Sequence, residues 1–225
     1  MRVVRGHAKT PETDRDASRR ILDWVTDAEE AVVRVWQPPR HVAFGRRDAS
    51  EPGFDEAVER ARAHNYPAVE RSVGGRAVAY TGTTVAFAKF EPIDDMRESI
   101  DERYDALRSQ VASALRAVGV DARRGEPPKS FCPGDHSLQC EGKIAGLAQR
   151  VARGAALTSG VMVLADHEEI AQITADVYDA LGVPFDPDTV GSVDRAGGDV
   201  AETIPALESA LTGNEAATAL PLRQI

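Results

Sequence analysis

The sequence predicts an α+β fold in which helices pack on a mixed, largely antiparallel β-sheet. Three observations indicate this: β-rich segments outnumber helical ones, most neighbouring β-rich segments are joined by short turns, and strands and helices do not alternate regularly. Regular alternation would instead favour a doubly wound parallel sheet. A chain of 225 residues can bury a substantial core, so we expect a single domain over residues 1–225.

Five segments have the apolar spacing of helices. In the longest of them, apolar residues recur every three or four positions from Ile100 to Val118. Gly182 and Pro184 follow another segment and are typical of a helix end. We therefore expect helices at residues 12–29, 54–64, 99–118, 168–181 and 197–211.

The remaining periodic segments are rich in β-branched and aromatic residues and predict strands. The pair Gly74-Gly75 lies between two of them, and a hairpin turn is the ordinary explanation of such a pair. From Thr212 onward we expect a frayed tail. The predicted strands are residues 31–36, 41–45, 68–73, 77–80, 83–90, 137–140, 143–150 and 155–164.

The chain is acidic, with a net charge of −9, and only four of its basic residues are lysines. This balance argues against a nucleic acid or an anionic membrane as partner. Two explanations of the composition remain open. Many acidic residues together with few lysines suggest adaptation to high salt. A GC-rich genome, which favours arginine codons over lysine codons, is the alternative explanation.

Several features indicate a cytoplasmic protein. No segment approaches the ~20 apolar residues of a membrane helix, and the first residues lack the apolar core of a signal peptide. The two cysteines, Cys132 and Cys140, are too few for a disulfide framework and fit no standard zinc spacing. We expect both thiols to be reduced.

Cys132 is the strongest candidate for a nucleophile. It stands in Phe-Cys-Pro-Gly, and Pro-Gly turns lie at the surface, where a free thiol is available to react. The alternative is a small buried apolar residue, as most free cysteines are. Cys140 lies in a predicted strand, so a core position is expected for it. His136 and Asp135 are near Cys132 in sequence and are weaker candidates for its base.

Lys143 and the glycine turn are the candidates for charge stabilisation. A lysine can supply the positive charge that a thiolate needs, although an edge-strand lysine also discourages aggregation. Gly74 and Gly75 let the backbone approach a ligand closely, and the flanking Arg71 and Arg76 suit a carboxylate or phosphate.

These motifs together resemble the superfamily of lipoate–protein ligases, lipoyl/octanoyl transferases and biotin ligases. The resemblance is carried by Arg71-Ser-Val-Gly-Gly-Arg-Ala-Val78 and Gly142-Lys-Ile-Ala-Gly-Leu-Ala-Gln-Arg150, with Val35-Trp-Gln-Pro-Pro39, Phe44-Gly-Arg-Arg47 and Asp188-Thr-Val-Gly-Ser192 around them. It covers about residues 30–195, which we expect to be the core of a biotin/lipoate ligase-type catalytic domain, followed by the C-terminal helix and tail.

The resemblance implies protein lipoylation and a set of site residues. Cys132 and Lys143 would be catalytic. The acyl carboxyl group or its adenylate would be bound by Arg71, Ser72, Gly74, Gly75, Arg76, Ala77 and Gly146. No metal site is implied.

The subfamilies differ in where the nucleophile stands. One transferase group has a cysteine after the lysine strand, where this chain has Ala155. The amidotransferases that depend on the glycine cleavage protein have a Ser-Tyr-Cys-Pro-Gly-like segment, which Ser130-Phe-Cys-Pro-Gly134 resembles. A histidine common in the family after the glycine loop is Tyr80 here, and a downstream His-Gly is Ser159-Gly160.

The favoured mechanism is thioester exchange. Cys132 would take an octanoyl or lipoyl group from a donor, such as an acyl carrier protein, and pass it to a lysine of a lipoyl domain, in an E2 subunit of a 2-oxoacid dehydrogenase or in the glycine cleavage H protein. Lys143 would favour the thiolate and stabilise charge on the acyl carbonyl oxygen. This route needs no cofactor.

Two alternatives stay open. An ATP-dependent lipoate ligase would use ATP and Mg²⁺ to form acyl-AMP, with Cys132 as a bystander. A non-catalytic acyl-carrier-binding module would keep the fold without turnover.

Overall fold

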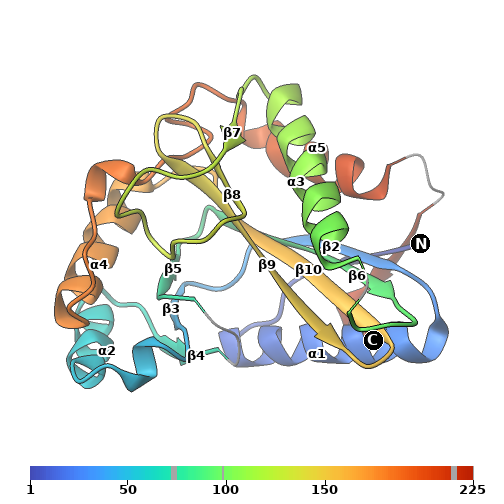
Figure 1. The fold of residues 1–225 in the computed structure, drawn as a ribbon, viewed down its shortest axis with the longest axis horizontal. Helices are drawn as coiled ribbons and strands as arrows, with labels where there is room; N and C mark the ends of the chain where they lie inside the picture. The colour runs from blue at the N-terminus through green and yellow to red at the C-terminus, as the bar shows by residue number, and fades with distance from the viewer. Residues whose placement is uncertain (72–74, 98, 214–216, 225) are drawn as a thin grey trace.

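Two β-sheets organise the fold, and helices pack against both of them (Figure 1). The computed structural model describes residues 1–71, 75–97, 99–213 and 217–224. Two predicted site residues, Ser72 and Gly74, therefore lie outside the described residues.

The larger sheet has eight strands in the order β11-β1-β2-β6-β10-β9-β8-β7. β1 is parallel to both β11 and β2, and every other neighbouring pair is antiparallel. The predicted mixed, largely antiparallel sheet is confirmed. Its strands are β1 (Arg2–Arg5), β2 (Val32–Trp36), β6 (Thr84–Pro92), β7 (Arg123–Arg124), β8 (Ser137–Gln139), β9 (Lys143–Ala152), β10 (Ala155–Val163) and β11 (Thr218–Pro221).

Alternation along the central strands gives this sheet two apolar faces. Val33 and Val35 pack into a core with α3 (Ile100–Ala117) and α5 (Val200–Thr212). Val32 and Phe90 pack on the other face, against α1 (Pro11–Ala28). Figure 1 shows α3 and α5 together on one side of the sheet and α1 on the opposite side.

The smaller sheet contains β3 (His41–Phe44), β4 (Ala68–Glu70) and β5 (Val78–Tyr80), and it packs with α2 (Phe54–Ala63) and α4 (His167–Ala180). The hairpin expected at the glycine pair is wrong. β4 and β5 both pair with β3, from opposite sides, so the connection between them crosses the end of β3. A side chain at Gly45 would meet the carbonyl oxygen of Gly75 at 2.0 Å, so the crossing needs glycine at Gly45.

In the described part of the tail, residues 217–224, the expected fraying is also wrong, because β11 pairs with β1 and a short 3₁₀ helix, Leu222–Gln224, follows it. β1 and β7 were not predicted. These short strands have little pattern of their own, and their partners are distant in sequence. Two more 3₁₀ helices are Asp48–Ser50 and Pro187–Thr189. Among the described helices, none combines the length and apolarity that a membrane span requires.

Candidate active site

A cavity of about 570 Å³ lies where β6, β9 and β10 of the large sheet meet β5 and the loop at residues 131–137. Its size is in the usual range for small-molecule sites, roughly 300–1,000 Å³. Much of its wall is apolar and is formed by Trp36, Val78, Ala86, Phe87, Ala88, Leu147, Leu157 and Val161. The polar groups at the wall include the predicted Arg71, Cys132 and Lys143.

The thiol of Cys132 lies beside an arginine. Nη2 of Arg71 is 3.5 Å from Sγ of Cys132 and also donates to the carbonyl oxygen of Arg76 at 2.5 Å. Burial acts to lower the pKa of the Arg71 guanidinium, but attraction to the Cys132 sulfur and to Tyr80 leaves that pKa above its ordinary value. Arg71 is therefore a permanent cation in contact with the sulfur.

The backbone at Cys132 is held in an unusual conformation. Its φ of 39° lies in the left-handed region, which costs a non-glycine residue about 1–3 kcal/mol. Its N–H donates to the hydroxyl of Tyr178 at 2.7 Å, and that hydroxyl donates to the carbonyl oxygen of Ala77 at 3.0 Å. Burial raises the pKa of Tyr178, so the hydroxyl stays protonated and keeps both bonds.

Lys143 holds the same turn from the other side but does not contact the sulfur. Its ammonium is buried, and it donates to the carbonyl oxygens of Phe131 at 2.9 Å and Cys132 at 2.7 Å and to Oε2 of Glu126 at 2.7 Å. A lysine has three N–H donors, so all of them are used. The cation in contact with the sulfur is Arg71, and the action of Lys143 on the thiolate stays a prediction.

Glu126 is a functional candidate that sequence reasoning missed. Besides Lys143, it accepts from the hydroxyl of Ser137 at 2.7 Å and from the N–H of Gly134 at 2.9 Å. Burial acts to raise the pKa of Glu126, but the bonds from Lys143 and Ser137 hold it below its ordinary value. No local motif marks this glutamate, because its partners come from a loop and a strand that only folding brings to it.

The described part of the glycine loop closes over the thiol. Gly75 has φ 94°, and a side chain there would lie 3.0 Å from Sγ of Cys132 and 2.8 Å from Nη2 of Arg71. Only glycine therefore lets the loop approach the sulfur this closely. Gly146 lines the cavity next to Lys143, and Ala77 contributes the carbonyl oxygen that accepts from Tyr178.

Arg76 is engaged in two ion pairs. Its Nη1 pairs with Glu51 at 2.7 Å and Asp48 at 3.3 Å, so two carboxylates already neutralise it. The role predicted for Arg76 in binding a carboxyl group stays a prediction.

Of the weaker candidates, His136 lines the cavity and Cys140 packs against the core. The His136 ring stacks on Tyr104 with centroids 3.7 Å apart, and both residues line the cavity. Tyr80 and Ser159, which stand where the family pattern has histidines, also line it. Cys140 follows the end of β8 and packs partly buried against the core formed with α3 and α5, close to the expected core position.

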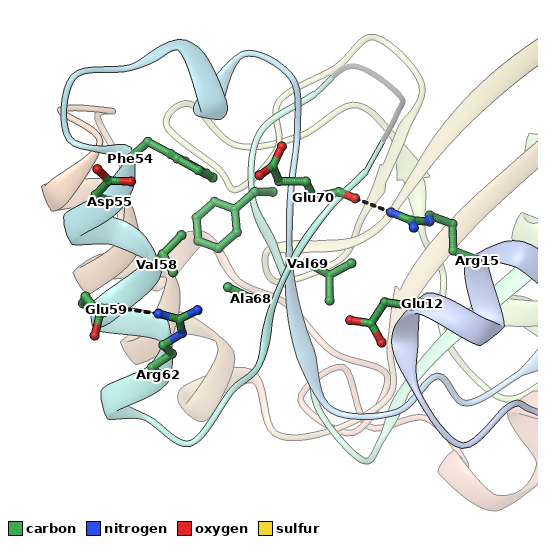
Figure 2. A pocket seen from close by; sticks show the side chains of 11 residues that line it. Glu12, Arg15, Phe54, Asp55, Val58, Glu59, Arg62, Ala68, Val69 and Glu70 are labelled. Carbon is green, nitrogen blue, oxygen red and sulfur yellow. Dashed lines mark hydrogen bonds and ion pairs between the residues drawn. The ribbon is translucent and has the colours of Figure 1, made fainter.

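A second cavity, of about 480 Å³, lies between α1, α2 and β4 (Figure 2). Phe54 and Val58 form part of its apolar wall. Its two arginines are engaged, Arg62 with Glu59 and Arg15 with the carbonyl oxygen of Glu70, as the dashed lines show. Its described lining contains no cysteine, histidine or lysine, so the candidate chemistry lies in the cavity that holds Cys132.

The family model described as "Lipoyl protein ligase A/B catalytic domain" matches residues 11–207. The chain belongs to this family. The match includes Cys132, Arg71, Lys143 and Glu126, so the cavity described above lies within the catalytic domain of a lipoyl protein ligase A/B family member.

Two curated relatives are both named octanoyl-[GcvH]:protein N-octanoyltransferase. The protein from Geobacillus kaustophilus is 33% identical over 126 residues, covering 56% of this chain and 44% of the relative. The protein from Exiguobacterium sp. is 30% identical over 156 residues, covering 68% of this chain and 55% of the relative. The chain thus spans about half the length of these relatives.

Solved structures share the fold at low identity. A lipoate-protein ligase A bound with ATP aligns with a TM-score of 0.74 and 21% identity, covering 96% of this chain and 88% of that chain. A bi-partite lipoate protein ligase from Thermoplasma acidophilum, described together with its E2 lipoyl domain, aligns with a TM-score of 0.69 and 18% identity, covering 97% of this chain and 86% of that chain. The predicted fold of a lipoate ligase catalytic domain is confirmed.

Proposed function

We propose that this chain transfers an octanoyl or lipoyl group to a lysine of a lipoyl-domain protein through a thioester on Cys132. The observation that carries the proposal is the position of the thiol: Sγ of Cys132 lies 3.5 Å from a guanidinium at the wall of a largely apolar cavity of about 570 Å³. A nearby cation favours the thiolate, which is the nucleophilic form. The apolar wall suits a medium-length acyl chain.

The reaction would proceed in two substitutions. In the first, the Cys132 thiolate attacks the acyl carbonyl carbon of the donor, a carbon–sulfur bond forms, and the donor group leaves with a proton. In the second, the amine of the acceptor lysine attacks the thioester, an amide forms, the amine gives up a proton, and the Cys132 thiolate is regenerated. No oxidant or nucleotide is consumed.

The contacts of Lys143 favour this route over an ATP-dependent ligase. In that alternative, Lys143 would bind the carboxyl group of an acyl adenylate. In the described structure its three donors are taken by Glu126, Phe131 and Cys132, so it has no N–H to offer unless the loop rearranges. ATP and Mg²⁺ belong only to the ligase alternative.

The names of the relatives suggest the partners. We propose octanoyl-GcvH as donor and the lipoyl domains of E2 subunits as acceptors, with an acyl carrier protein as a second possible donor. We also propose that residues 1–225 act as one catalytic unit, and that the enzyme works in the cytoplasm, where the free thiols Cys132 and Cys140 stay reduced.

Intact-mass spectrometry of the enzyme and of a lipoyl-domain acceptor tests the proposal. The wild-type protein and Cys132→Ala are incubated with octanoyl-GcvH, with octanoyl-loaded carrier protein, or with octanoate and ATP. We expect an octanoyl adduct on the wild-type enzyme without ATP, no adduct on Cys132→Ala, and acceptor modification only with wild type. Acceptor modification that needs ATP and is undiminished in Cys132→Ala would instead identify a ligase.

A further inference from the structure

We propose that Glu126 is a positioning residue for Cys132, which fixes the thiol-bearing turn and neutralises Lys143 so that Arg71 is the cation that acts on the sulfur. The inference concerns the same site as the proposed acyl transfer, but its first test needs no acyl donor. Glu126 belongs to neither of the motifs that carry the family resemblance.

Glu126 joins three separate parts of the site. It lies shortly after β7, its Oε1 accepts from the N–H of Gly134, and its Oε2 accepts from both Ser137 Oγ and Lys143 Nζ. Gly134 is in the loop that carries Cys132, Ser137 begins β8 and Lys143 begins β9. One carboxylate thus ties the loop to the sheet on the C-terminal side of the nucleophile.

Through Lys143, Glu126 also controls the turn at Cys132. The ammonium donates to the carbonyl oxygens of Phe131 and Cys132, two successive carbonyls on either side of the Cys132 backbone, where φ is 39°. Glu126 provides the third acceptor, and its negative charge offsets that of the buried ammonium. A buried ammonium without this partner would leave uncompensated positive charge beside the thiol.

Around the sulfur, the described residues thus place a mutually neutralised pair and a cation in contact with the thiol. Lys143 and Glu126 form the pair, and Arg71 is the cation in contact with Sγ. The charged and titratable groups that line this cavity or neighbour the thiol come from several elements: Arg15, Asp48, Arg71, Tyr80, Tyr104, Glu126, Asp135, His136, Lys143 and Tyr178. Most of them stay unchanged in the variants below, so differences between the variants isolate Glu126 and Arg71.

The rate at which iodoacetamide alkylates Cys132, followed against pH by intact mass, tests the charge balance. Cys140 is replaced by serine in every protein, so that the measured alkylation is that of Cys132. We expect Glu126→Gln to lower the midpoint pH of alkylation by about 0.5 or more, because one unneutralised charge several ångströms away favours the thiolate by about that amount. Arg71→Gln should raise the midpoint, because it removes the contacting cation.

Two further variants separate charge from geometry. Glu126→Asp keeps the charge on a shorter side chain, so its alkylation midpoint should match that of wild type. Both Glu126 variants should lower kcat of acyl transfer between about 10- and 100-fold, with little change in KM, because the nucleophile is misplaced while the cavity is intact. Glu56→Gln, which breaks an exposed ion pair with Arg60 on α2, is the matched control and should change neither quantity.

The outcomes are distinct. A Glu126→Gln midpoint equal to or above that of wild type would overturn the proposal, as would wild-type kcat in both Glu126 variants. A wild-type protein that forms no acyl adduct with any donor would overturn the proposed function, while the alkylation midpoints would still decide the role of Glu126.

Discussion

At the scale of single residues, the site depends on how two cations divide their contacts. Arg71 contacts the sulfur, whereas Lys143 is fully engaged with Glu126 and two backbone carbonyls. Through these bonds Lys143 stabilises the left-handed backbone of Cys132, and the Glu126 carboxylate neutralises the charge of the Lys143 ammonium. In the described structure, Lys143 holds the turn at Cys132 through these two carbonyls.

This arrangement predicts a stability effect at Lys143. In Lys143→Met, the Glu126 carboxylate and two carbonyls lose their donor, so we expect the free energy of unfolding in urea to fall by about 1–3 kcal/mol at pH 7. Lys89→Met is the matched control, because Lys89 pairs with Glu91 at the surface and should change stability by less than about 0.5 kcal/mol. Equal effects of the two substitutions would contradict the structural role of Lys143.

The same pair predicts how this effect depends on pH. The pKa of Glu126 lies below its ordinary value of 4.5 in the folded protein, so the ion pair stabilises the fold fully above about pH 4.5. Its contribution is lost as the pH falls through the lower folded value. The difference in stability between wild type and Lys143→Met should therefore shrink when urea unfolding is repeated between pH 5 and about pH 3. A difference that grows on acidification would have the wrong sign.

At the scale of elements, the crossing of the β4–β5 connection over β3 brings the glycine loop onto the thiol. β4 ends one residue before Arg71, and β5 begins three residues after Gly75. Both strands pair with β3, on opposite sides, and the described Gly75 lies against Gly45 at the end of β3 and beside the Cys132 sulfur. The two motifs, about sixty residues apart in sequence, meet for this reason.

Gly75→Ala tests this close approach. Its Cβ would lie 3.0 Å from the Cys132 sulfur in a backbone conformation with φ 94°, so the loop or the thiol must shift. We expect the rate of acyl-enzyme formation to fall by at least about 10-fold, since misplaced reacting atoms cost rate steeply. Gly82→Ala, in the β5–β6 turn with no heavy atom within 4 Å, should leave the rate unchanged. A normal rate for Gly75→Ala would mean that the loop and the thiol do not meet during the reaction.

At the scale of the whole molecule, the net charge of −9 is the dominant property. Like charges on one surface repel and oppose compaction, and salt screens that repulsion. We expect the melting temperature in neutral buffer to rise when KCl is increased from about 0.02 M to about 1 M, over which the Debye length falls from roughly 20 Å to 3 Å. A melting temperature that is constant over this range would remove the argument for adaptation to salt and leave codon usage as the explanation of the composition.

Local patterns determined most of the elements. Periodicity marked the five described α-helices, and seven of the eight predicted strands were found close to their expected bounds, because these segments carry enough apolar residues to define a face. The strand predicted at 68–73 is found at Ala68–Glu70, and residues 72 and 73 lie outside the described residues. β1, β7 and β11 escaped prediction, since two to four residues give no period and their pairing partners are far along the chain. Cys132 and Lys143 could be predicted as site residues because the sequence around each has a recognisable motif, and the structure places both at the wall of one cavity.

Only the tertiary structure decided which charged groups contact one another. The sequence predicted a thiol, two arginines and a lysine as site residues, and it indicated the family. It did not determine that Arg71 contacts the sulfur, that Arg76 pairs with Asp48 and Glu51, or that Glu126 neutralises Lys143. Ion pairing acts over a few ångströms between residues that only the packed sheets bring together, and no local pattern records it.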